Sequence, residues 1–403
     1  MDIKKVKQSA LSSDIEKKEL TIGFMPLTDC APLIVAKELG YFAKFGLNVK
    51  LSKQNSWSSM RDKLAANVLD AGQLLAPMPL AGAYGFDNQC HDFVAPFILS
   101  RNGNAITFSK NLHNKINHSL GFQQPLDASY LRSIVSQLKA TRKKLTFATV
   151  YPHSCHYLQL VSYFDQGGID KDDIRIIILP PESMVAALRN NEIDGFCVGG
   201  PYNAKAVREG IGVTIATSID IWPNLPEKVL GFKQQWYKQN PNTTNALICA
   251  LALACRWLDN VPNRFEAAKL LSHKEYINTS IDVIAPSLLG SCLTCKGEMP
   301  RLIDEYNSFS SNDSDNANRP VLNEIKQLQR YFNLALDNIE TNVETNVETT
   351  FTNLTNIDLN RIYDASIYDQ AMLWHAIHSQ QRIDTNDNCK FNNAPIKVGN
   401  DRF

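Results

Sequence analysis

The sequence predicts an α/β protein made of two similar units and a helical C-terminal region. Short β-like segments alternate with segments of helical spacing, a pattern typical of open, largely parallel sheets covered by helices. The pattern begins near residue 21, stops in a polar stretch from 110 to about 144, and starts again at 145. From Asn240 onward the apolar residues show helical spacing only.

The first unit opens with a strand over 21–25 (TIGFM) and a helix over 31–42, in which Gly40 is a stop signal. A second strand is expected over 47–51 (LNVKL). The other elements expected here are a helix over 57–67, a buried strand over 71–75, a proline-rich turn over 76–81 that leads into a helix, and strands over 93–100 and 105–109.

The second unit repeats this order. A strand is expected over 145–150, a helix over 156–166 and a strongly β segment over 174–179 (IRIIIL). They are followed by a helix over 181–190 and strands over 195–198 and 212–216. A complete α/β unit is therefore inserted in the middle of the chain.

Two apolar helices, TTNALICALALACRWLDN and NEIKQLQRYFNLALDNI, follow the second unit. The repeat NVETNVET is of low complexity and predicts an exposed insertion. The domains expected are a flexible N-terminus (1–19), lobe I (20–125 and 226–383, with the insertion near 340–352), lobe II (126–225) and a flexible tail (384–403).

The composition argues against several functions. Lys+Arg and Asp+Glu balance at 41 each, whereas broad binding to nucleic acid or to a membrane surface needs a basic excess. No apolar run approaches the length of a membrane span. The N-terminus lacks the apolar core of a secretory signal, and nine irregularly spaced cysteines fit a reducing compartment. A cytoplasmic location is therefore expected.

Neither a catalytic motif nor a metal site is expected. The sequence contains no Walker, GxGxxG, HExxH or GxSxG pattern. His153 and His156 flank Cys155, but a metal would need distant ligands and a nucleophilic pair would need an orienting carboxylate. Cys292 and Cys295 form a CxxC without a second pair nearby. We expect a binding protein without a cofactor, not an enzyme.

Candidate binding residues lie where strands turn into helices, which is where open α/β sheets bind ligands. Thr28 and Asp29 occupy such a turn, where they either cap the next helix or face a ligand. Trp57 begins a helix in a polar setting, and its indole N–H is only a donor, which suits an anion. Asn104 either makes a turn or donates its amide hydrogens into a cleft.

Further candidates come from the second unit. His156 lies at a helix start, where it faces either solvent or a ligand. Lys228 lies at the return to the first unit, where a cleft is expected, and there it would supply a full positive charge. Two more turns contribute Pro180, after IRIIIL, and Cys197, Val198 and Gly199, which form either a tight turn or an approach to an anion.

Several of these segments carry a family resemblance. TIGFMPLTDCAPLIVAKELGYFAKFGLNVKL, NSWSSMRDKLAANVLDAGQLLAPMPLA, ILPPESMVAALRNNEIDGFCVGGPYNAKA and LPEKVLGF resemble the nitrate-binding family of ABC-transporter solute receptors. The resemblance implies a type II periplasmic-binding-protein fold, with two α/β lobes around a cleft. It implies a ligand site formed by Thr28, Asp29, Trp57, Asn104, His156, Pro180, Cys197, Val198, Gly199 and Lys228. The chain has Asn104 where such receptors have Gln, and Gly200-Pro201-Tyr202 where they have Glu-Pro-Trp.

Without an export signal, the chain most resembles the cytoplasmic nitrate/nitrite sensors (NasS-type). The resemblance implies nitrate or nitrite as ligand and an ANTAR-type RNA-binding antiterminator as partner, with no direct contact to nucleic acid and no membrane insertion. Two alternatives remain at this point. One is the binding component of a nitrate or bicarbonate importer. The other is an enzyme similar to thiamin-pyrimidine synthases, which use His and iron.

Overall fold

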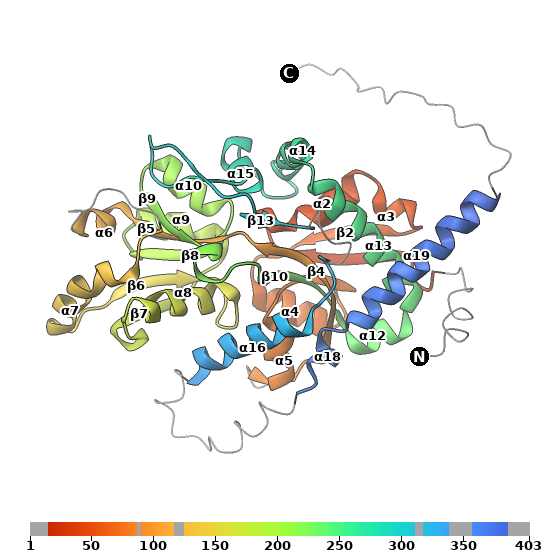
Figure 1. Ribbon diagram of the computed structural model, residues 1–403, viewed down its shortest axis with the longest axis horizontal. Helices are drawn as coiled ribbons and strands as arrows, with labels where there is room; N and C mark the ends of the chain where they lie inside the picture. Colours follow the sequence, from red (N-terminus) through yellow and green to blue (C-terminus); the bar gives the residue numbers. More distant parts are fainter. Residues whose placement is uncertain (1–14, 87–89, 117–124, 311–316, 338–356, 386–403) are drawn as a thin grey trace.

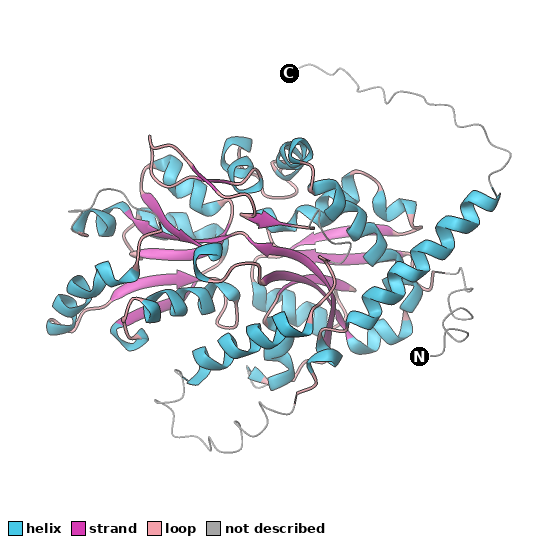
Figure 2. Ribbon diagram, in the orientation of Figure 1, coloured by secondary structure: helices cyan, strands magenta, loops and turns pink. Residues whose placement is uncertain are grey.

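Two large β-sheets lie next to each other in this protein, each covered by helices on both faces (Figures 1 and 2). A small sheet pairs β11 (Ser291–Cys292) with β12 (Arg301–Leu302). The computed structural model describes residues 15–86, 90–116, 125–310, 317–337 and 357–385. The arrangement confirms the predicted α/β fold with a helical C-terminal region.

The first sheet has the strand order β13-β4-β10-β3-β1-β2. Strand β1 is parallel to β2 and β3, whereas β10 is antiparallel to β3 and β4, and β13 is antiparallel to β4. Its strands are β1 (Glu19–Phe24), β2 (Asn48–Lys53), β3 (Ala71–Leu75), β4 (Phe93–Asn102), β10 (Pro226–Lys233) and β13 (Asn307–Ser308).

The second sheet has the strand order β7-β6-β8-β5-β9. Strand β6 is parallel to β7 and β8, and β5 is antiparallel to β8 and β9. Its strands are β5 (Asn104–Ser109), β6 (Leu145–Thr149), β7 (Ile174–Ile178), β8 (Gly195–Gly199) and β9 (Gly212–Thr217).

The chain crosses between the sheets twice, from β4 to β5 and from β9 to β10. The first crossing turns at Gly103, whose φ is 91° and where a Cβ atom would lie 2.1 Å from Oδ1 of Asn307. Each crossing strand enters its new sheet antiparallel to its neighbours, so both sheets are mixed, and the expectation of largely parallel strands is wrong. Strand β5 thus lies in the second sheet, although 20–125 was expected to form lobe I.

The first sheet is buried mainly by the long apolar helix α13 (Pro241–Leu258), together with α2 (Ala31–Glu38) and α19 (Ala365–Thr385). Gly40, in the left-handed conformation, ends the first predicted helix, and a short helix follows it. The remaining helices around this sheet are α3 (Tyr41–Lys44), α4 (Trp57–Ala65), α5 (Met78–Tyr84), α12 (Gln234–Gln239), α14 (Val261–Leu271), α15 (Ile281–Leu288) and α18 (Leu359–Ile362).

Helix α8 (Cys155–Gln166) packs on the second sheet and presents its N-terminus to the crossing strands. Each large sheet together with its helices is called a half of the molecule. Helix α16 (Leu322–Asp337) contacts both halves (Figure 1): the Phe332 ring lies 5.7 Å from the Tyr84 ring of the first half and 5.6 Å from the His153 ring of the second. The other helices here are α6 (Lys110–Lys115), α7 (Arg132–Ala140), α9 (Met184–Arg189), α10 (Tyr202–Glu209) and α11 (Ser218–Ile221).

The ends of the chain were expected to be flexible. Residues 15–19 are held in place: the Glu16 carboxylate accepts hydrogen bonds from the Thr243 backbone, and Lys17 forms a 2.6 Å ion pair with Asp70. The NVETNVET insertion and residues 386–403 lie outside the described residues. Within the described ranges, no helix is both long and apolar enough to span a membrane.

Candidate functional site

Lys228 is the centre of a buried group of charged side chains between the two sheets. It lies on β10, which returns from the second sheet and inserts between β3 and β4. Its side chain is 0% exposed, and Nζ lies 2.9 Å from Oδ2 of Asp29 and 2.7 Å from Oε1 of Glu227. Burial disfavours the ammonium, but the attraction of Asp29 and Glu227 outweighs it and raises the pKa of Lys228.

Asp29 reaches this lysine from a short 3-10 turn (Thr28–Cys30), which begins after a three-residue connection from the end of β1. Its other oxygen, Oδ1, accepts a 2.6 Å hydrogen bond from Nε2 of Gln73, and Oε1 of Gln73 accepts one from the backbone of Met25. The side chain makes no capping hydrogen bond at this turn or at α2. The capping interpretation is therefore wrong, and Asp29 is a partner of Lys228.

Trp57 and His156 approach the same lysine from opposite sheets. The Trp57 ring, at the first position of α4, has its centroid 5.6 Å from Nζ of Lys228. His156 lies in the first turn of α8, and its Nε2 is 3.7 Å from Oε1 of Glu227. Burial, and then the Lys228 ammonium, hold the pKa of His156 well below its usual value, so the imidazole is neutral at pH 7.

Asn104 and Gly199 meet at the edge of this group. They are paired residues of β5 and β8, and a Cβ atom at Gly199 would lie 3.3 Å from Oδ2 of Asp29 and 3.5 Å from Oδ1 of Asn104. Asn104 donates from Nδ2 to Oε1 of Gln159 at 2.9 Å. The turn itself is made by the preceding Asn102 and Gly103, which have positive φ. Asn104 thus contributes a side chain to the buried junction.

The other predicted residues are divided between the junction and the surface. Thr28 is buried there, and its N–H donates to the Gly200 carbonyl at 2.8 Å. Cys197 and Val198 are buried in β8, and the Val198 carbonyl accepts from Asn203. Pro180 is exposed before a 3-10 turn (Pro181–Ser183), and no contact among the described residues joins it to Lys228.

The two halves are closed over this group. Besides the Thr28–Gly200 bond, the Tyr202 hydroxyl donates to the Pro26 carbonyl at 3.2 Å, and Arg61 donates to the Tyr151 hydroxyl at 3.0 Å. One continuous apolar cluster also contains residues from both sheets. Consequently Asp29, His156 and Lys228 are all buried, and a ligand can reach them only if the halves separate.

Several buried polar atoms in this junction have no hydrogen-bond partner among the described residues. They are Nε1 of Trp57, both ring nitrogens of His156, Oδ1 of Asn104 and Oγ1 of Thr28. Buried polar groups in folded proteins are almost always hydrogen-bonded, so such a concentration indicates a site for a small polar ligand. The indole and the ammonium are donors only, the neutral imidazole has one donor and one acceptor nitrogen, and Oδ1 of Asn104 is an acceptor. The ammonium and the indole N–H favour a ligand that is rich in acceptor atoms.

Sequence reasoning missed Glu227, Gln73 and Gln159. Glu227 lies beside Lys228 at the start of a strand whose next residues, 229–232, are Val, Leu, Gly and Phe, and this pair of adjacent charges was the signal available. Burial raises the pKa of Glu227, although Lys228 and Asn104 lower it. The two glutamines lie within a strand and a helix whose pattern gives no sign of a polar role.

The possibility of an iron site at His153 and His156 was weighed from the sequence. His153 packs among aromatic rings, 4.8 Å from Phe86, while His156 points towards Glu227. In the part of the chain that the structure describes, no group of three or more His, Cys, Asp or Glu side chains is placed to hold a metal ion.

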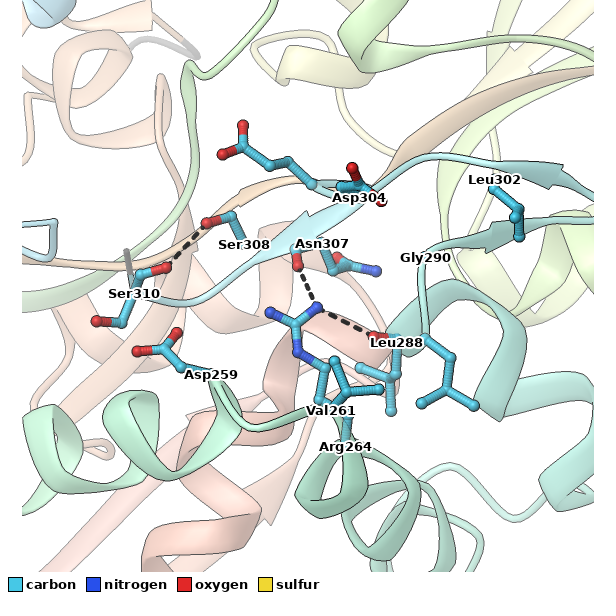
Figure 3. A pocket seen from close by; sticks show the side chains of 12 residues that line it. Asp259, Val261, Arg264, Leu288, Gly290, Leu302, Asp304, Asn307, Ser308 and Ser310 are labelled. Carbon is cyan, nitrogen blue, oxygen red and sulfur yellow. Dashed lines mark hydrogen bonds between the residues drawn. The ribbon is translucent and has the colours of Figure 1, made fainter. Parts of the chain in front are cut away.

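A cavity lies away from Lys228, beside the helices α14 and α15 (Figure 3). Its volume is about 530 Å³, and its residues include Asp259, Arg264 and Asp304. Arg264 donates from Nη1 to the carbonyls of Leu288 and Asn307 at 3.1 and 2.9 Å, so it connects backbone segments.

Comparison with known proteins places this chain among solute-binding proteins. The model of the NMT1-like family matches residues 13–272. "Nitrate import ATP-binding protein NrtC" of Synechocystis sp. is 38% identical over 309 residues, which cover 76% of this chain and 44% of that protein. "Bicarbonate transport ATP-binding protein CmpC" of the same organism is 39% identical over 274 residues, which cover 67% of this chain and 39% of that protein. The chain thus spans less than half of either relative.

The crystal structure of the periplasmic nitrate-binding protein NrtA from Synechocystis PCC 6803 superimposes with a TM-score of 0.74 at 25% identity and covers 91% of both chains. This confirms the periplasmic-binding-protein fold and agrees with a binding protein rather than an enzyme. The chain belongs to the NMT1-like family, with the fold of the nitrate-binding protein NrtA.

Proposed function

We propose that this protein binds nitrate or nitrite between its two sheets, at Trp57, His156 and Lys228. The observation that carries the proposal is the set of unpartnered buried polar atoms around Lys228, which includes the indole N–H of Trp57. The relatives support it, because nitrate or nitrate import appears in the names of NrtA and NrtC. The bicarbonate relative makes bicarbonate the competing ligand.

The donors match the chemistry of a small planar oxyanion. Nitrate carries one charge over three acceptor oxygens. The Trp57 indole offers one N–H, the neutral His156 imidazole a second, and Lys228 a third, because its two carboxylate partners use only two of its three donors. Charge-assisted hydrogen bonds of this kind are strong, particularly where water is excluded.

Binding is coupled to closure. The donors come from both halves, since Trp57 and Lys228 belong to the first sheet and its helices and His156 belongs to the second. An anion therefore makes its full set of contacts only when the halves come together, so it favours the closed form. A partner that prefers the open form is released by the same event.

For the role in the cell, we propose a cytoplasmic sensor of the NasS type. In its free state the protein holds an ANTAR-type antiterminator, and the anion releases this partner so that nitrate-assimilation genes are transcribed. The support is the sequence resemblance described above. The alternative is the binding component of an importer, which the solved periplasmic relative and the transport relatives favour equally.

Calorimetric titration tests the ligand. Nitrate, nitrite, bicarbonate and methanesulfonate are titrated separately into the whole protein. We expect saturable binding of nitrate or nitrite at a 1:1 ratio and weaker binding of the others. Tighter binding of bicarbonate than of nitrate and nitrite, or binding of none of the four anions, would contradict the proposal.

Cell fractionation and affinity purification test the role. For a sensor, the native protein stays in the cytoplasm and carries an RNA-binding partner that nitrate removes from the complex. Recovery from the periplasm, or copurification with a transporter in the membrane, would establish the importer component instead.

A further inference from the structure

Glu227 presents a difficulty for any anion at this site. Its carboxylate is 1% exposed and lies 2.7 Å from Nζ of Lys228 and 3.7 Å from Nε2 of His156. Two carboxylates, Asp29 and Glu227, therefore share one ammonium, which leaves one net negative charge in the buried group. Burying unbalanced charge is costly, and a bound anion would add a second negative charge to the same enclosed space.

The neighbouring groups do not balance this charge. His156 is held neutral by burial and by Lys228. Cys155 and Cys197, which approach Glu227 from α8 and β8, are held as thiols because burial, followed by the charge of Glu227, raises the pKa of each well above its usual value. Lys228 supplies the only full positive charge that the described residues bring to Glu227.

Both oxygens of the Asp29 carboxylate already have close donors. One of its oxygens contacts Lys228 and the other accepts the short amide hydrogen bond from Gln73, whose orientation is fixed by the Met25 backbone. Glu227 contacts the same ammonium through Oε1, and its burial favours the neutral acid.

We propose that Glu227 takes up one proton from solvent when the anion binds, so that the protein binds an anion and a proton together. This inference rests on the function proposed above. With the anion bound and Glu227 protonated, the buried group again carries one net negative charge, as it did before binding. Protonation also turns Glu227 from an acceptor into a hydrogen-bond donor, which removes its repulsion for the anion. Glu227 is thus the residue that allows a site with two carboxylates to accept an oxyanion.

The proposal fixes the direction of the pH dependence. While Glu227 is already protonated in the free protein, affinity for the anion is independent of pH. As the pH rises above the pKa of the free form, each binding event must take up a proton, and affinity falls about tenfold per pH unit until the pKa of the bound form is passed.

The test measures proton uptake directly. Nitrate is titrated by calorimetry from about pH 5 to about pH 9, a range that covers raised carboxyl pKa values, in pairs of buffers with different ionisation enthalpies. For the wild type we expect an uptake that rises from near zero to about one proton per nitrate, with the fall in affinity given above. For Glu227→Gln we expect nitrate binding with almost no uptake and little pH dependence. Glu266→Gln, an exposed acid on α14, is the matched control and should behave as the wild type.

Three results would overturn the inference. If the wild type binds nitrate without proton uptake over the whole range, the coupling does not exist, although the proposed function stands. If Glu227→Gln still takes up a proton, another group is the acceptor. If the wild type binds no anion, the proposed function and the inference both fail. Should Glu227→Gln not fold, infrared difference spectra of the wild type decide: nitrate must produce the carbonyl band of a neutral carboxylic acid, and its absence contradicts the proposal.

Discussion

Lys228 and Arg264 are both cations of the first half, but their hydrogen-bond partners differ. Lys228 is fully buried, whereas Arg264 is partly exposed. Arg264 donates to the backbone carbonyls of Leu258, Leu288 and Asn307, at the edge of a cavity of about 530 Å³ (Figure 3). Lys228 contacts two carboxylates and lies among buried polar atoms that lack partners among the described residues. Burial lowers the pKa of Arg264, whereas the carboxylates raise that of Lys228.

In the function proposed above, the arrangement of charges and unpartnered polar atoms, and not the volume of a cavity, distinguishes the junction at Lys228. Carbonyls that converge on Arg264 are neutral and tie three chain segments together, which is a structural task. The junction at Lys228 is closed, yet it combines full charges with unpartnered polar atoms that a folded protein otherwise avoids. Substitutions at the two cations should therefore separate stability from ligand binding.

The largest effect is expected for Lys228→Ala. Nitrate binding should be lost, and the free energy of unfolding should fall by about 3–5 kcal/mol because two buried carboxylates lose their counter-ion. Calorimetry and urea unfolding measure the two quantities. Lys233→Ala is the control, since Lys233 lies on the same strand and donates to the Ala65 carbonyl. Unchanged nitrate affinity in Lys228→Ala would show that the site lies elsewhere.

Arg264→Ala should affect stability alone. The loss of three hydrogen bonds to backbone carbonyls should lower the free energy of unfolding by about 2 kcal/mol, because water reaches the open cavity and replaces part of the loss. The same titration as above should give the wild-type nitrate affinity. If Arg264→Ala folds but no longer binds nitrate, the cavity beside Arg264, and not the junction at Lys228, would be the binding site.

Trp57→Phe should weaken nitrate binding about tenfold, or about 1.4 kcal/mol, because it removes one N–H donor and keeps most of the aromatic packing. Trp222→Phe is a matched control. Trp222 is also buried with an unpartnered indole nitrogen, but its ring stacks 3.9 Å from Tyr331 of α16. If both variants lose the same affinity, the effect comes from packing and not from the Trp57 donor.

The smallest effect at neutral pH is expected for His156→Gln in the free protein, where the change appears only as the pH falls. The pKa of His156 is depressed by folding, so only the unfolded chain takes up this proton as pH falls below about 6.5. The stability that neutral His156 contributes is thus complete above that pH and is lost below it, by up to about 1.4 kcal/mol per pH unit. Urea unfolding at several pH values should give a shallower dependence for the variant. An identical dependence would mean that His156 is charged in the folded state.

The local signals in the sequence were sufficient to indicate several of the side chains that meet at the buried junction. Trp57 and His156 stand at helix starts after strands, and Lys228 stands where the chain returns to the first unit, so the pattern of elements indicated all three. The sequence placed Asp29 in the correct turn but favoured a capping hydrogen bond, because a carboxylate before a helix usually caps it. The structure instead pairs Asp29 with Lys228. Pro180 follows a strand in the same way, yet the chain turns it outward.

The sequence by itself determined the order of elements, the insertion of one α/β unit in another, and the strand-to-helix turns that face the junction, because apolar periodicity and turn residues act over a few neighbouring positions. Only the tertiary structure decided the direction of the crossing strands and the sharing of Lys228 by Asp29 and Glu227. Asp29 and Lys228 lie 199 positions apart in the sequence (228 minus 29) and are in contact only in the folded protein. Charge balance at such a distance depends on burial and geometry, which no local pattern encodes.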